Sequence, residues 1–144
     1  MTGLFMQSCV RFAGHPDALR GWAKTHNLVQ LPEQARRGFM HGASGVAFDA
    51  STAAGKLVLI SDDGGGCLVV AERVNGSAVL ASLEDDMRHA GINLTLSRDA
   101  ADAQESNLQL RDYTAVLGRS TWRIVLGTVR DQQGGQAMLS AVHD

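Results

Sequence analysis

The chain has 144 residues, which fits one domain over residues 1–144 with a hydrophobic core of its own. Apolar residues make up 44%, charged residues 19% and the net charge is −2, so the composition excludes the strongly basic surface of a nucleic-acid-binding protein. No apolar run approaches the roughly 18 residues that a membrane-spanning helix requires. We therefore expect one globular domain that neither binds nucleic acid nor spans a membrane.

The first forty residues have the spacing of helices. Phe5, Cys9 and Phe12 fall at i, i+4 and i+7, so they share one face of a first helix. Residues 16–27 and 32–42 each begin with proline, which suits the first helical position because its missing N–H would have no partner there. Each of these two segments ends in Asn or Gly, residues that tolerate the left-handed conformation of a helix end. The pattern predicts three helices.

From residue 45 the hydrophobic period changes to that of strands. Residues 56–61 and 67–74 are rich in β-branched side chains and are joined by "DDGGG", which is typical of a hairpin. Glycine supplies the positive φ that such turns need, and aspartate caps turns with its carboxylate. The triple glycine lacks the lysine of a Walker loop and leads into a strand, so we interpret it as a turn and not as a phosphate cradle.

A helix returns over residues 77–90, with Ser77 as the expected N-cap and Gly91 just past the end. Apolar and polar residues then alternate over 92–96, which predicts a half-buried strand. Residues 97–106 have no hydrophobic periodicity beyond alanine, and we expect an exposed loop there.

The C-terminal third alternates in the manner of an antiparallel meander. The alternation within 107–117 changes phase near Arg111 and Asp112, as a β-bulge would require, and further strands follow within 121–130 and 137–142. The fold class is therefore α+β: N-terminal helices packed on one face of a mainly antiparallel sheet, with one further helix between strands and a C-terminal β-meander.

The two cysteines, Cys9 and Cys67, admit three interpretations. Cys67 could be a nucleophile, but that needs a partner base and surroundings that lower its pKa. Both thiols could be buried and free, since cysteine packs as a small apolar residue. A disulfide between them would close a long loop and hold the first helix on the sheet. Two cysteines without CxxC spacing do not make a zinc site, and we expect no metal and no cofactor.

Other candidate residues carry weaker signals. The five histidines stand in no catalytic motif, although one of them could work with Asp62 or Asp63 in a hydrolase. Tyr113 and Trp122 could line a ligand surface, since each has an apolar body and a polar tip. The alternative is that Trp122 is an inward-facing residue of the sheet.

Five segments resemble a little-characterised family of small exported or lipoprotein-like proteobacterial proteins. They are "LFMQSCVRFAGHPDALRGWA", "GFMHGASGVAFDA", "DGGGCLVV", "TWRIVLGTVRD" and "AMLSA". The resemblance implies that Cys9 and Cys67 pair with each other. It implies no established activity, so no catalytic role is transferred to any residue.

Three hypotheses of function follow. The first, and the one we favour, is a small non-enzymatic domain of the bacterial envelope that binds a protein or a small ligand, for example as an inhibitor or immunity-type protein. The second is a thiol- or histidine-dependent hydrolase, and the third is a cytosolic sensor or scaffold of the profilin-like sort. The segment from Met1 to Phe5 lacks the features of a signal peptide. The first hypothesis places the protein in the periplasm or outside the cell, whereas a native start at Met1 would place it in the cytoplasm.

Overall fold

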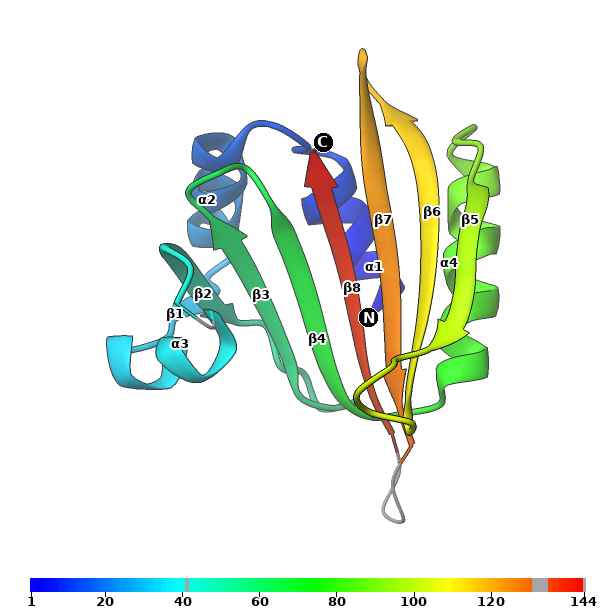
Figure 1. Cartoon of the computed structure of the whole chain (residues 1–144). Helices are drawn as coiled ribbons and strands as arrows, with labels where there is room; N and C mark the ends of the chain where they lie inside the picture. Colours follow the sequence, from blue (N-terminus) through cyan, green and yellow to red (C-terminus); the bar gives the residue numbers. More distant parts are fainter. Residues whose placement is uncertain (41, 131–134, 144) are drawn as a thin grey trace.

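The computed structural model describes residues 1–40, 42–130 and 135–143 and consists of an eight-stranded antiparallel sheet with helices on its faces (Figure 1). The helical segments are α1 (Thr2–Phe5), the π-helical turn η1 (Met6–Val10), α2 (Pro16–Thr25), α3 (Glu33–Met40) and α4 (Gly76–His89). The strands are β1 (Val29–Gln30), β2 (Gly45–Asp49), β3 (Leu57–Asp62), β4 (Cys67–Val74), β5 (Thr95–Ala101), β6 (Leu108–Leu117), β7 (Ser120–Val129) and β8 (Gly135–His143). Their order across the sheet is β1-β2-β3-β4-β8-β7-β6-β5, which confirms the α+β class and the C-terminal meander. No helix within the described ranges is both long enough and apolar enough to cross a bilayer.

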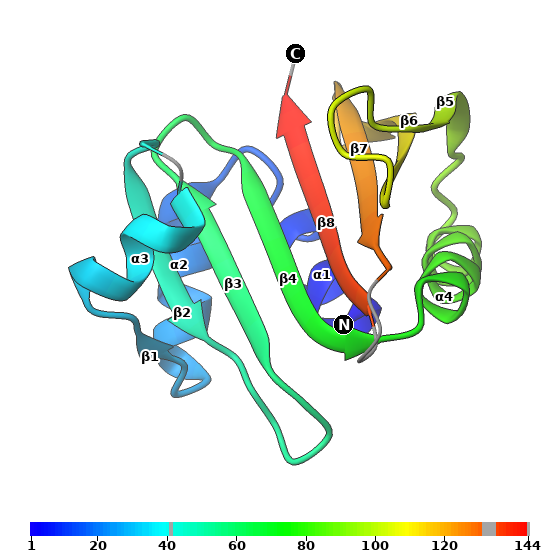
Figure 2. The same cartoon turned by 60° about the horizontal axis from the view of Figure 1, so that its bottom comes forward.

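The main core lies between the sheet and the helices α1, η1, α2 and α4. This helix-covered face carries Phe48, Leu59, Val69, Leu139 and Ile124 from five adjacent strands, and all five side chains are buried. The opposite face, which we call the open face, is covered by α3 at one side only (Figure 2). There a second and smaller cluster consists of Met40, Ala47 and Ile60.

Local sequence signals explain the N-terminal helices. Phe5 and Cys9 are buried on one side of α1 and η1, as their spacing predicts. Pro16 occupies the first position of α2, and Asn27 ends that helix with φ at 58°. Gly42, with φ at 86°, follows α3 in the same way. The helix signals between residues 16 and 42 are therefore confirmed.

The triple-glycine segment is a hairpin turn, as predicted. Ser61 of β3 lies opposite Cys67 of β4, and the Oδ1 atom of Asp62 accepts a hydrogen bond of 3.0 Å from the Gly66 N–H. Gly65 has φ at 96°, a conformation that side chains with a Cβ rarely adopt. A Cβ at Gly66 would collide with the Asp62 carboxylate. Glycine at both positions therefore lets the chain turn tightly around the Asp62 carboxylate.

Two local predictions need correction. The N-cap of α4 is Asn75 and not Ser77, because the Asn75 side chain accepts a 3.0 Å hydrogen bond from the Ala78 N–H. Part of the expected loop, 97–101, belongs to β5, and this edge strand is exposed on both faces. A strand without a buried face has no reason to alternate apolar with polar residues, so its sequence looks like that of a loop.

The bulge expected in β6 lies in its partner strand. The β5–β6 pairing shifts between Leu96 and Arg98, whereas β6 pairs regularly with β7. The phase of β6 changes because its half-buried leucines, Leu108 and Leu110, face one side of the sheet while Tyr113 faces the other. The predicted turn at 131–136 falls largely on residues outside the described ranges.

Arg20 fastens α2 to the end of β3. Its Nε donates to the Ser61 hydroxyl at 3.1 Å, and its Nη2 donates to the Ser61 carbonyl at 3.0 Å. The same Nη2 lies 2.8 Å from the Asp63 carboxylate, which is itself largely exposed. The bonds to buried Ser61 matter more for stability than the exposed ion pair, since solvent screens the latter.

We expect Arg20→Ala to lower the free energy of unfolding by about 2 kcal/mol, because the buried Ser61 groups lose a charged donor. Asp63→Asn, the matched control, should cost less than about 1 kcal/mol because it removes only the exposed ion pair. Urea unfolding of the three proteins measures both values. Equal losses in the two variants would contradict this division between Ser61 and Asp63.

Candidate functional site

Cys9 and Cys67 are joined in a disulfide. Their Cα atoms are 5.3 Å apart although 58 positions separate them in the sequence, and both side chains are buried. The bond attaches η1 to the first residue of β4. Of the three interpretations of the cysteines, the disulfide is confirmed; a free Cys67 nucleophile and two free thiols are both wrong for this structure.

The residues of the hydrolase hypothesis have structural contacts. Asp62 caps the hairpin turn, and Asp63 pairs with Arg20. The histidines of the described chain lie at the ends of elements: His15 before α2, His26 after it, His89 at the end of α4 and His143 at the end of β8. The fifth, His41, lies outside the described residues. Within the described ranges, no three His, Cys, Asp or Glu side chains come close enough together to hold a metal ion.

The two aromatic candidates both point toward the helices. Trp122 is only 2% exposed and packs edge-on against the His143 ring at 5.0 Å between ring centroids, so it belongs to the core. The inward-facing alternative for Trp122 is therefore correct. Tyr113 is 3% exposed, and its hydroxyl donates a 2.9 Å hydrogen bond to Glu84 of α4. Tyr113 also lines a cavity, so it alone of the pair can contact a ligand.

A groove runs between α4 and the strands β5 and β6, and we call it the α4 groove. Its wide cavity, of about 840 Å³, lies at the end of the sheet where β4 leads into α4. Its narrow cavity, of about 360 Å³, lies beside the second half of α4. The two cavities share Arg111, which therefore stands at the boundary between them. Sites that bind small molecules commonly enclose about 300–1,000 Å³.

Arg111 of β6 is the central polar group of the α4 groove. One of its terminal nitrogens lies 3.5 Å from the Asp99 carboxylate of β5, and its guanidinium carbon lies 6.0 Å from the centre of the Tyr113 ring. Its Nε is buried and has no hydrogen-bond partner among the described residues. Arg111 thus lies between the wide cavity and Tyr113, whose hydroxyl bonds to Glu84.

The wide cavity combines polar side chains with a helix end. Gly76 and Ser77 in the first turn of α4 form one wall, and Gln109 of β6 and Thr128 of β7 contribute from the sheet. Gly76 approaches β7 so closely that a Cβ there would lie 3.0 Å from the Thr128 methyl carbon. Three arginines complete the lining: Arg73, Arg111 and Arg130. Such a lining suits the binding of a polar ligand through hydrogen bonds and charge.

Sequence reasoning missed this site. Arg73, Arg111 and Arg130 are far apart in the chain. Their strands lie in one region of the sheet only because β4 pairs with β8, β8 with β7 and β7 with β6. One local signal was available: Arg111 stands two residues before Tyr113, so in a regular strand both face the same side. An arginine on an inward-facing position of a sheet indicates a polar cavity.

Replacing both cysteines with alanine should lower the free energy of unfolding by about 4 kcal/mol, because a 58-residue loop is no longer closed in the unfolded chain. The wild type in reductant should lose a similar amount, and the double variant should not respond to reductant. Urea unfolding with and without reductant measures this. Alkylation of both thiols in the native, unreduced protein would show that the bond is absent.

Burial, followed by the hydrogen bond to Glu84, raises the pKa of Tyr113 well above its ordinary value of 10.0. A raised folded-state pKa means that the associated stability is fully present below the unfolded pKa and is lost as pH rises above about 10. Because Tyr113 is the single tyrosine, tyrosinate absorbance reports it alone. In an alkaline titration we expect tyrosinate to form only as circular dichroism shows unfolding. Ionisation near pH 10 in the folded protein would contradict the burial.

Comparison of the chain with protein-family models, with curated proteins and with solved structures found no match. The disulfide and the α4 groove are therefore the features from which a function can be inferred.

Proposed function

We propose that this chain is a small non-enzymatic binding domain of the bacterial envelope whose ligand occupies the α4 groove. The observation that carries the proposal is the pair of adjacent cavities beside α4, which meet at Arg111. Together they offer the volume, the polar groups and the aromatic side chain, Tyr113, that small-molecule sites combine. Binding, with no chemical step, is the activity that these residues support.

The disulfide supports a compartment outside the cytosol. Disulfides persist in oxidising environments such as the periplasm and are rare where thiols are kept reduced. The Cys9–Cys67 bond closes a long loop through the core, so it contributes to the fold itself. This favours a periplasmic or secreted protein over the cytosolic profilin-like sensor.

The bonded state of Cys67 also weighs against the thiol-dependent hydrolase. A sulfur in a disulfide is not a thiolate and cannot attack a substrate as one. Asp62 and Asp63 each have a structural partner, Gly66 and Arg20 respectively. A catalytic role for either carboxylate would have to compete with that contact.

A protein ligand is the second candidate, as for an inhibitor or immunity-type protein. The observation that favours it is the open face of the sheet, where Val116 is 61% exposed and Val142 is 44% exposed. A protein partner could cover these two apolar side chains, which lie on β6 and β8. The α4 groove remains the stronger candidate because its polar groups converge on one concave surface.

The experiment blocks the α4 groove with a bulky side chain. Ser77→Trp places an indole at the wall of the wide cavity, whereas Ser82→Trp places the same side chain on α4 at a residue that lines neither cavity. The proteins are incubated with a periplasmic extract and examined by native mass spectrometry. We expect a small molecule to stay bound to the wild type and to Ser82→Trp but not to Ser77→Trp. Retention by all three proteins, or by none, would contradict a ligand site in the α4 groove.

A further inference from the structure

We propose that the wide cavity of the α4 groove binds a small organic anion through its phosphate or carboxylate group. The inference rests on the proposed function and names the chemical class of its ligand. It is carried by the arginines of the cavity, by the backbone conformation of Arg73 and by the partly exposed guanidinium group of Arg111.

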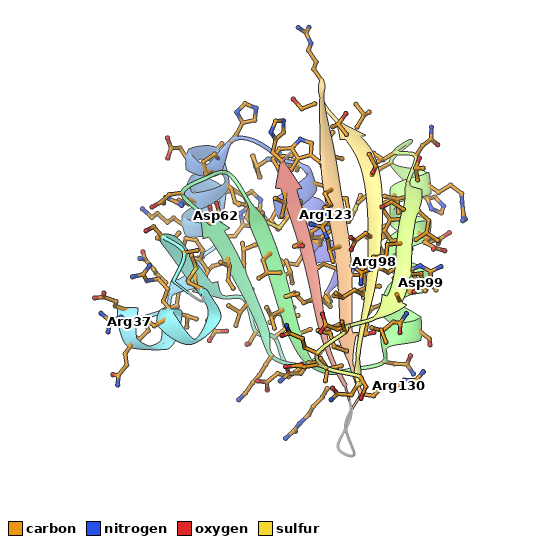
Figure 3. The ribbon with its side chains drawn as sticks, in the orientation of Figure 1. Arg37, Asp62, Arg98, Asp99, Arg123 and Arg130 are labelled. Carbon is orange, nitrogen blue, oxygen red and sulfur yellow. A yellow bond between two sulfur atoms is a disulfide. The ribbon has the colours of Figure 1, made fainter. Side chains whose placement is uncertain are left out.

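The charges in the wide cavity are opposite in sign to the charge of the whole chain. Arg73, Arg111 and Arg130 line it, and Asp99 is the one carboxylate among its described lining residues. The chain as a whole has a net charge of −2. Figure 3 shows Asp99 on β5 and Arg130 beyond the lower end of β7. A cavity with an excess of guanidinium groups attracts anions from solution.

The negative charge of Asp99 does not neutralise the positive charges of the three arginines. Its Oδ1 accepts a 2.8 Å hydrogen bond from the Gln109 side chain, and its Oδ2 lies 3.5 Å from Arg111. The Arg111 side chain is 25% exposed and lines the wide cavity. Its terminal guanidinium nitrogens are charged donors, and an oxyanion in the wide cavity is an acceptor that suits them.

Arg73 adds an independent observation. It lies at the irregularity between Glu72 and Val74 in the β4–β8 pairing, with φ at 56°. This left-handed conformation favours glycine, so an arginine there strains the backbone. The side chain borders the wide cavity. A residue that strains the chain while it places a charge at a cavity points to a role in binding.

The volume and the lining of the wide cavity indicate the size and the charged group of the anion. A volume of about 840 Å³ exceeds that of a bare phosphate ion and is within the range for a small organic molecule. Guanidinium groups bind phosphate and carboxylate alike through paired hydrogen bonds. The first turn of α4 forms a wall of the same cavity and adds a weaker attraction for the anion.

Binding of glycerol 3-phosphate and of citrate, each at constant ionic strength, tests the proposal. In two-dimensional amide NMR we expect at least one probe to shift the signals of Arg73, Ser77 and Gln109 with a saturable curve. Arg73→Gly and Arg130→Gln should each weaken that binding about tenfold, through loss of a charged hydrogen bond. Arg73→Gly should nevertheless unfold at the same or a higher urea concentration, because glycine relieves the positive φ.

Arg119→Gln is the matched control. Arg119 lies in the turn between β6 and β7, at the opposite end of β7 from Arg130. The substitution Arg119→Gln removes the same charge as Arg130→Gln. It should change affinity by less than about twofold, since screening by salt weakens a distant charge. A preference for one probe identifies the phosphate or the carboxylate as the recognised group.

Three outcomes would overturn the proposal, and each differs from a failure of the proposed function. If neither probe binds, the wide cavity is no anion site. If Arg119→Gln weakens binding as much as Arg73→Gly, the attraction comes from the overall charge of the protein and not from the wide cavity. If Ser77→Trp still releases a small molecule that the wild type retains, and that molecule is uncharged, the groove binds a ligand but the anion class is wrong.

Discussion

The covalent link between Cys9 and Cys67 is the constraint on which the arrangement of layers depends. It joins the short N-terminal helical segment to β4, a strand in the middle of the sheet. Segments as short as α1 and η1 are marginal as isolated helices, so they need tertiary contacts to stay helical. The bond holds this segment where Phe5 enters the core and where α1 contacts both β4 and α4. The N-terminal helical segment thereby covers the centre of the helix-covered face, and α4 packs against α1.

The α4 groove follows from how polarity is distributed across the sheet. α4 packs on β7 and β8, where residues such as Ile124 and Leu139 are buried. Farther along the same face, β6 presents Arg111 and Gln109 in place of aliphatic side chains. A helix cannot pack closely over such groups without removing their charges from water, which costs free energy. The Tyr113–Glu84 hydrogen bond spans the gap, so the helix stays at a fixed distance from β6 and the space beside it remains open.

The fold could be predicted from the sequence wherever a local rule sufficed. Pro16 and Asn27 mark a helix because of their backbone preferences, and the triple glycine marks a turn for the same reason. β5 could not be recognised, because an edge strand exposed on both faces carries no alternation. The groove could not be predicted, since Arg73 and Arg111 line one cavity only after strands distant in the sequence have paired. Local sequence signals thus predict single helices, strands and turns. A site whose residues come from several strands can be predicted only once the pairing of those strands is known.

The position of β8 has a consequence for how the molecule forms. β8 lies between β4 and β7 although it is the last strand along the chain. Until residues 135–143 pair, the chain can form only two separate sheets, β1–β4 and β5–β7, and their edge strands β4 and β7 leave backbone N–H and C=O groups unpaired. Such unpaired sheet edges are templates for pairing with other molecules. A chain of this topology therefore completes its sheet only when β8 pairs, and a chain without residues 135–143 would expose the edges of both β4 and β7 to aggregation.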